Sequence, residues 1–363
     1  MMSTYTSRSS IARWVLLLPA ALLLAACSGA GQTGPTSWPN VSADESVVFV
    51  AKGPAVYAVD TDSGGQLWSY PETPDRDLSF YAAPAIASDG VVYAGAYDGS
   101  THVIDAATGE GEPFAQAPSR VIGSPAVTDQ LVLVPTDGGT LFALDRETGA
   151  PLWTFEAGGP LWSAPRIDGE TVYLGAMSHH LFALNLADGR KLWETDLGYA
   201  IADTPTLQDG SLLVGTLADS LVAVRTRDGA ESWRAPTAGW QWGSPAIADS
   251  MAYFGDVTGT VYALDLSTGE QVWAETSGGA ITSSPVIAEG LVLVGFQNDR
   301  LVAYDLEQGE IAWQAATAGA IQADPVVANG KVIVAVTADD ALLQAFNLQT
   351  GAPAWTFQPA PPG

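Results

Sequence analysis

The sequence predicts an all-β protein built as one eight-bladed β-propeller of four-stranded antiparallel blades. Tryptophans recur at a step of 40 residues: Trp153, Trp193, Trp233, Trp273 and Trp313, with Trp68 before them and Trp355 after. Prolines keep the same step at Pro125, Pro165, Pro205, Pro245, Pro285 and Pro325, preceded by Pro84 and Pro39. A glycine stands four residues before each tryptophan: Gly64, Gly149, Gly189, Gly229, Gly269, Gly309 and Gly351. Periods of about 40 residues are typical of propeller blades.

Residues 165–194 show how one unit makes four strands. A strand at 165–167 opens on a proline, a position where no ladder hydrogen bond is lost. Asp168-Gly169 supplies a tight turn, and 171–175 and 181–185 are rich in β-branched, aromatic and leucine side chains. A second turn, Asp188-Gly189, leads into the last strand at 191–194, because glycine adopts positive φ without a steric penalty. No stretch shows helical periodicity.

A four-stranded sheet of this size cannot bury both faces alone, so the units must stack radially. We therefore interpret the fourth-strand tryptophans as wedges that dock each blade on its neighbour. These are Trp68, Trp153, Trp193, Trp233, Trp273, Trp313 and Trp355. The second unit has Pro113 at this position, where we expect a longer loop. No spare strand is evident, so we expect the first and last blades to close the ring by direct contact.

The N-terminus has the pattern of an export signal. Arg8 and Arg13 precede an apolar run at 14–24, which is shorter than the roughly 20 residues of a membrane span. The ending Leu-Ala-Ala-Cys at 24–27 resembles the lipobox of bacterial lipoproteins. This resemblance implies a signal peptide at 1–26, acylation of Cys27 and a flexible tether at 27–36, leaving 37–363 as the propeller. An ordinary signal peptide or an uncleaved anchor are the alternatives.

Composition excludes several classes of protein. Cys27 is the only cysteine, so an internal disulfide, a thiolate metal cluster and a haem-attachment motif are all impossible. Loss of 1–26 removes two arginines and no acid, which brings the net charge from −26 to about −28. Such a charge disfavours nucleic acid and anionic lipid headgroups and favours basic partners. The acids are scattered, as on a solvated surface.

The unit at 262–273, Tyr-Ala-Leu-Asp-Leu-Ser-Thr-Gly-Glu-Gln-Val-Trp, has near copies at 142–153 and 57–68. It resembles the tryptophan-docking repeat of the PQQ-like propellers, and the match covers 37–357. The aspartate of this unit, Asp265, is replaced in three other blades, by Asn185, Arg225 and Asn347. A turn-capping residue tolerates these replacements and a ring of metal ligands does not, so we predict a turn and no metal site.

The resemblance implies one of two functional classes. Quinoprotein dehydrogenases of this type hold PQQ under a Cys-Cys disulfide with calcium, which a chain with one cysteine cannot reproduce. The other class is the outer-membrane assembly lipoproteins of the BamB family, which share the lipobox, tether and eight blades and use no cofactor. We therefore expect a non-catalytic, monomeric scaffold, lipid-anchored in the cell envelope, that binds envelope proteins. The dehydrogenase and a sugar- or peptide-binding sensor remain alternatives.

The candidate binding site is one mouth of the central channel. Residues just before each opening proline enter the innermost strand, and they vary where the tryptophans and prolines do not. Aromatic and polar side chains at a concave mouth suit a small ligand or a peptide. The candidates are Tyr81, Trp162, Asp203, Trp240, Trp242, Gln322 and Asp324. Alternatively, Trp162 and Trp242 only plug the funnel, or partners bind hairpin tips at 256–259 and 298–300, which we expect on the opposite face.

Overall fold

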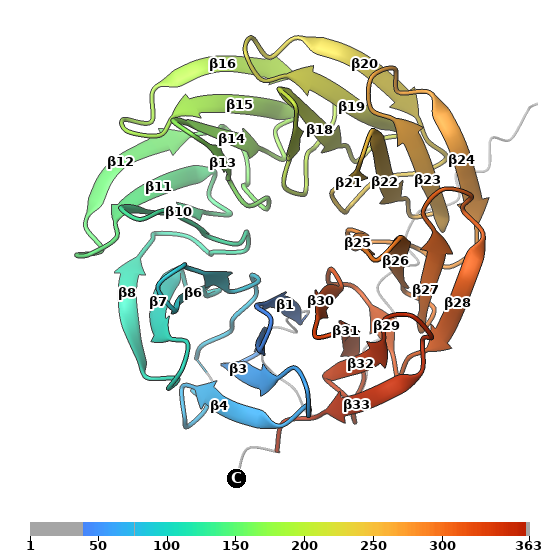
Figure 1. Ribbon diagram of the computed structural model, residues 1–363. Coiled ribbons are helices and arrows are strands. Elements are labelled where there is room, and N and C mark those ends of the chain that lie inside the picture. The colour runs from blue at the N-terminus through green and yellow to red at the C-terminus, as the bar shows by residue number, and fades with distance from the viewer. Residues whose placement is uncertain (1–38, 76, 361–363) are drawn as a thin grey trace, which may run out of the picture. The chain divides into compact units, whose positions relative to one another are not determined.

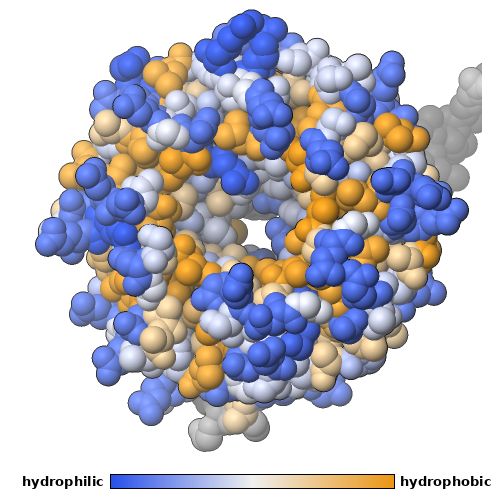
Figure 2. Space-filling model, viewed as in Figure 1, coloured by the Kyte–Doolittle hydropathy of each residue, from blue (hydrophilic) through white to orange (hydrophobic). Residues whose placement is uncertain are grey.

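Strands in the computed structural model follow the four-strand rhythm of the repeat (Figure 1). The structure describes residues 39–75 and 77–360; the predicted signal peptide, Cys27 and the tether lie outside these residues. Eight sheets stand side by side around a central opening, which Figure 2 shows from one face. The predicted all-β, eight-bladed propeller is therefore confirmed. None of the described residues forms a helix long and apolar enough to cross a membrane.

The first four blades come from the first half of the chain. Blade 1 contains β1 (Asn40–Ala43), β2 (Val47–Lys52), β3 (Ala55–Asp60) and β4 (Gln66–Tyr70). Blade 2 contains β5 (Ala85–Ile86), β6 (Val91–Gly95), β7 (Ser100–Asp105) and β8 (Gly111–Gln116). Blade 3 contains β9 (Ala126–Val127), β10 (Leu131–Pro135), β11 (Thr140–Asp145) and β12 (Pro151–Glu156). Blade 4 contains β13 (Arg166–Asp168), β14 (Thr171–Gly175), β15 (His180–Asn185) and β16 (Lys191–Asp196).

The remaining four blades complete the ring. Blade 5 contains β17 (Thr206–Gln208), β18 (Ser211–Gly215), β19 (Ser220–Arg225) and β20 (Glu231–Pro236). Blade 6 contains β21 (Ala246–Ala248), β22 (Met251–Gly255), β23 (Thr260–Asp265) and β24 (Gln271–Thr276). Blade 7 contains β25 (Val286–Ala288), β26 (Leu291–Phe296), β27 (Arg300–Asp305) and β28 (Ile311–Ala316). Blade 8 contains β30 (Val326–Ala328), β31 (Lys331–Thr337), β32 (Leu343–Asn347) and β33 (Pro353–Phe357), with an extra short strand, β29 (Ala320–Ile321), on β31.

The hydrophobic core lies between neighbouring blades. Leu133 and Leu141 of blade 3, for example, pack in one cluster with Val172, Leu174 and Phe182 of blade 4. Full burial of each such side chain contributes roughly 1.5–3 kcal/mol. Because both faces of a blade are covered in this way, its middle strands are almost continuously apolar.

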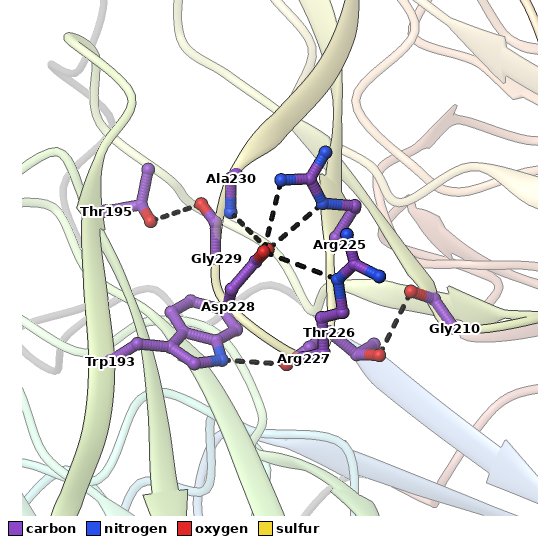
Figure 3. Close-up of polar contacts among 9 residues, drawn as sticks. All are labelled: Trp193, Thr195, Gly210, Arg225, Thr226, Arg227, Asp228, Gly229 and Ala230. Atoms are coloured by element: carbon purple, nitrogen blue, oxygen red, sulfur yellow. Dashed lines mark hydrogen bonds and ion pairs between the residues drawn. The ribbon is translucent and has the colours of Figure 1, made fainter.

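Blades 4 and 5 show how the tryptophans dock (Figure 3). The Trp193 Nε1–H donates to the Thr226 carbonyl at 2.7 Å, and the Thr195 hydroxyl donates to the Gly229 carbonyl at 2.5 Å. Gly229 has φ +70°, and a Cβ there would lie 2.6 Å from the Trp193 ring. Only glycine therefore fits between the turn and the indole. The same indole-to-carbonyl bond recurs at Trp68, Trp153, Trp233, Trp273, Trp313 and Trp355.

Blade 2 corrects one expectation, because its loop is not extended. Pro113 lies inside β8, paired with His102 in the ladder, beside a bulge between Thr101 and His102. The proline is tolerated because β8 is the outermost strand of its blade. The backbone of Phe114 packs against Gly149 of blade 3, in the place that an indole takes at the other junctions. A Cβ on Gly149 would meet the Phe114 carbonyl oxygen at 2.4 Å.

The repeated acidic residue caps the turn between the third and fourth strands. Asp265 accepts hydrogen bonds from the backbone N–H groups of Ser267 and Thr268 at 2.9 and 3.0 Å. Hydrogen bonds from the Ser267 and Thr268 side chains lead the causes that lower the pKa of Asp265. Asn185 and Asn347 accept the corresponding backbone bonds, as expected for a turn residue.

Arg225 fills this position in blade 5 with different chemistry (Figure 3). Its guanidinium pairs with Asp228 at 3.1 Å, and Asp228 Oδ1 accepts the Ala230 N–H at 3.2 Å. The Arg225 hydrogen bond is the main reason that the pKa of Asp228 falls to about 2. The turn is thus capped by the neighbouring acid. Within the described residues, no three His, Cys, Asp or Glu side chains are grouped to hold a metal.

The ring closes by direct contact of blades 1 and 8, since the described strands include none that the two blades share. The Trp355 indole donates to the Thr61 carbonyl at 2.9 Å. Lys331 of blade 8 pairs with Asp62 of blade 1 at 2.8 Å. Asn329 donates to the Thr61 hydroxyl at 3.0 Å, and an apolar cluster joins the two blades.

Candidate functional site

The predicted mouth residues are brought together on one cavity of about 520 Å³. They come from loops that lead from the outermost strand of one blade to the innermost strand of the next (Figure 1). The cavity is lined by all seven candidates: Tyr81, Trp162, Asp203, Trp240, Trp242, Gln322 and Asp324. Asn40, Ile122, Val257, Thr282 and Gln297 also line it. Figure 2 shows how the centre of the ring is hollowed.

Two tryptophans from loops 80 residues apart form one wall of this cavity. The rings of Trp162 and Trp242 stack with centroids 6.4 Å apart and planes inclined by 13°. The Trp162 indole N–H donates to Asp137 at 3.0 Å, which fixes its orientation. Trp240 is 52% exposed, which is high for a tryptophan. Neither Trp162 nor Trp242 is fully buried, so the pair offers aromatic surface to the cavity.

A chain of contacts extends this wall around the mouth. The rings of Tyr81 and Tyr97 lie 5.9 Å apart. The Arg120 guanidinium lies 4.4 Å from the centre of the Tyr97 ring and donates to its hydroxyl at 2.7 Å. Arg120 also lies 3.9 Å from Asp137, the acceptor of the Trp162 indole. Side chains from several consecutive loops therefore hold one another in place.

Below the aromatic wall, the residues directly before the opening prolines form a polar belt. The Ala164 N–H donates to the Thr204 hydroxyl at 3.1 Å. The Ser244 N–H donates to the Ser284 hydroxyl at 2.9 Å, and the Ser284 N–H donates to Asp324 Oδ1 at 2.6 Å. In each case a backbone donor of one blade meets a side-chain acceptor of the next. These bonds satisfy the backbone where no β-ladder is available.

Asp203 holds this belt together from a half-buried position. Its carboxylate accepts the N–H groups of Thr204 at 2.7 Å and Ser244 at 2.8 Å, and the Ser284 hydroxyl at 3.1 Å. Loops entering three different blades are thereby fixed on one side chain. Desolvation by burial nevertheless raises the pKa of Asp203.

Asp324 is the second acid of the cavity. Its side chain is exposed to the channel, where the surrounding ring of protein partly desolvates it. This desolvation, followed by the charge of Asp203, raises the pKa of Asp324 to about 7. Two carboxylates bound to the same Ser284 therefore share a site that disfavours both charges.

Two expectations about other residues are changed by the structure. The hairpin tip at 256–259 lies on the same face as the mouth, because the Val257 N–H donates to the Trp240 carbonyl at 3.0 Å and Val257 lines the cavity. The tip at 298–300 is on this face too, since the adjacent Gln297 lines the same cavity. A backbone hydrogen bond thus links a hairpin tip to a mouth loop. The repeat spacing did not indicate that these two kinds of loop lie on the same face.

One unusual residue beside the site was missed in the sequence. Gln241, only 1% exposed, has a buried Oε1 without a hydrogen-bond partner. Its repeat position is apolar in the neighbouring units: Phe80, Val121, Leu161, Ile201, Ile281 and Ile321. Aligning the residue four before each proline reveals this exception between Trp240 and Trp242.

The cavity does not fit the PQQ cofactor of related enzymes. PQQ carries three carboxylates, whereas the lining contributes Asp203 and Asp324 and no Lys, Arg or His. The single cysteine precludes a disulfide above the ring. His102 lies in blade 2, bonded to Tyr70 and Ser100, and is not part of the lining.

The fold, the tryptophan docking and the turn chemistry define a propeller of PQQ-like repeats. The chain belongs to the family described as outer membrane protein assembly factor BamB, whose model matches residues 28–112, 111–201, 183–280 and 257–363. These matches together include all eight blades.

Individual proteins resemble the chain more distantly. The crystal structure of BamB from Moraxella catarrhalis superposes with a TM-score of 0.70 at 20% identity, covering 82% of this chain and 93% of that one. The computationally designed Ika8 protein gives a TM-score of 0.74 at 17% identity, covering 87% and 98%. At these identities the likeness shows the fold. A quinohemoprotein alcohol dehydrogenase of Comamonas testosteroni is 30% identical over 141 residues, 33% of this chain and 20% of that enzyme. The chain thus spans about a fifth of that relative.

Proposed function

We propose that this protein is a non-catalytic, lipid-anchored scaffold of the cell envelope that binds partner proteins in outer-membrane protein assembly. The observation that carries this proposal is the BamB family match, which runs from residue 28 through the last blade. Cys27 would carry the lipid, directly before the matched segment. The proposed recognition face is the channel mouth, because exposed aromatic side chains are common anchors of protein interfaces.

The anchor and the partners can be tested separately. Intact-mass spectrometry should find a processed, acylated Cys27 in the wild type and none in Cys27→Ala. For the partners, detergent-solubilised membranes expressing the full chain should yield outer-membrane assembly proteins on affinity purification. Trp162→Ala with Trp242→Ala should deplete them, whereas Leu152→Ala, an exposed residue on β12, should not. Equal recovery with an unrelated lipoprotein as bait would contradict the scaffold proposal.

A second candidate function is a PQQ-dependent dehydrogenase, which the 30% identity to the Comamonas enzyme favours. The chemistry of the cavity lining and the single cysteine argue against it. Purified protein incubated with PQQ and calcium should show no dye-linked alcohol or sugar oxidation. Turnover that requires both additions would place this alternative first.

A further inference from the structure

We propose that the channel cavity binds a guanidinium group, between the Trp162–Trp242 wall and the Asp324 carboxylate. The group would belong either to free arginine or to an arginine side chain of a peptide. This inference rests on the proposed function in taking the mouth as the recognition face. It goes further by naming the chemistry that the mouth recognises.

The charges of the lining favour a cation. Asp203 and Asp324 are both in the lining, which contains no Lys, Arg or His. Neither acid forms an ion pair with another described residue. Where these carboxylates are ionised, an anion would be repelled, and a neutral sugar would leave them without a counter-charge. The protein's net charge of −26 would also draw cations toward the ring.

The two acids have different roles in this site. Asp203 accepts three hydrogen bonds from the polar belt and is needed to position the loops. Asp324 accepts one, from the Ser284 N–H. A carboxylate has about four acceptor sites, so Asp324 retains capacity for a ligand. Asp324 is also the more accessible of the two, and we assign it as the residue that contacts the cation.

The aromatic wall selects among cations. Tryptophan is the strongest aromatic partner for a cation, and a guanidinium stacks on an indole while its planar fork bonds a carboxylate. An ammonium is a compact point charge that stacks less well. The Trp162 ring is held by Asp137 and by Trp242, so little ordering is needed when a planar group binds. About 520 Å³ lies within the usual range of small-ligand sites.

Isothermal titration of the purified full chain in detergent at pH 8, above the pKa of about 7 of Asp324, tests this inference. The probes are Nα-acetyl-arginine methylamide, its neutral isostere Nα-acetyl-citrulline methylamide, the lysine analogue and free L-arginine. We expect saturable binding of the arginine probe, at least about tenfold tighter than the citrulline probe. Tighter binding of the blocked probe than of free arginine identifies a peptide side chain as the source, and the reverse identifies the free amino acid.

Two variants locate the site. Asp324→Asn should weaken the arginine probe at least about tenfold and leave the citrulline probe unchanged. Glu147→Gln removes one exposed acid elsewhere and should change neither. Equal affinity for arginine and citrulline, or unaltered binding by Asp324→Asn, overturns the inference. Because no partner protein is present, this result is independent of the pull-down, and failure here would leave the scaffold proposal standing.

Discussion

Trp162 and Trp242 are 80 residues apart in the sequence, yet their indole rings stack 6.4 Å apart at an angle of 13°. The loop that enters blade 5 separates them along the chain and contributes Ala202 at the same repeat position. A small residue there leaves room for the two indoles to meet across it. The mouth is therefore shaped by side-chain size at one repeat position, while the docking tryptophans stay uniform.

Stacking of Trp162 on Trp242 should be visible by circular dichroism. Indoles this close and nearly parallel should couple, so Trp162→Phe and Trp242→Phe should each remove the same exciton feature from the circular dichroism spectrum. The double variant should remove no more than either single variant. A double-mutant cycle should give a coupling free energy of about 0.5–1.5 kcal/mol. Additive spectral changes would show that the rings do not stack.

Docking tryptophans should matter more to stability than mouth tryptophans. Trp233 packs in the cluster between blades 5 and 6 and donates to the Leu266 carbonyl at 2.9 Å. Trp233→Ala should therefore lower the free energy of unfolding by about 3–5 kcal/mol in chemical denaturation. Trp240→Ala, at an exposed position, is the matched control and should change it by about 0.5 kcal/mol or less. A loss below about 1 kcal/mol for Trp233→Ala would refute the docking role in this blade.

The periodic part of the fold could be predicted because each blade repeats the same physical problem. The spacing predicted that each fourth-strand tryptophan docks on the neighbouring blade, and the structure shows Trp193 doing so against the turn at Gly229. The docking of blade 2 could not be predicted in this way, because Pro113 stands at the position of the tryptophan. Outermost strands tolerate proline, and the Phe114 backbone covers Gly149 where an indole is missing.

The candidate site was predictable as a set of residues but not as a geometry. Position before the opening proline placed Tyr81, Trp162 and Asp324 at one mouth. The geometry depends on side-chain rotamers around a closed ring. These rotamers decide which aromatic rings stack and allow Ser284 to contact both Asp203 and Asp324. Periodicity contains no information on these rotamers. Nor did it show that the tip at 256–259 lies on the same face, a pairing set by the Val257 backbone.

Closure of the ring can be tested with two glycines that share a conformation. Gly64 has φ +72°, and a Cβ there would lie 2.7 Å from the Trp355 ring across the closing interface. Gly90 has φ +82° with no atom within 4 Å of such a Cβ. Both alanine variants suffer backbone strain, but Gly64→Ala should cost about 1–3 kcal/mol more because of overpacking. Equal losses in thermal or chemical unfolding would mean that Trp355 does not close the ring through this turn.

Asp324 should make stability fall as pH rises. Its pKa is about 7 in the folded protein against roughly 3.9 for an unfolded aspartate. Between these values the folded state binds more protons than the unfolded state, so the free energy of unfolding decreases from about pH 4 to about pH 7 and then levels off. The raised pKa of Asp203 acts in the same direction. The titratable residues of the lining are Tyr81, Asp203 and Asp324, and tyrosine does not ionise in this range.

Asp324→Asn isolates this effect, because asparagine can still accept the Ser284 N–H and resembles the protonated acid. The variant should match the wild type in Tm near pH 4 and exceed it at pH 8, as measured by calorimetry at fixed ionic strength. Glu147→Gln, which removes an exposed acid, should show no such divergence and controls for the loss of one negative charge. If the Tm difference between Asp324→Asn and wild type is the same at pH 4 and pH 8, Asp324 does not titrate within the channel.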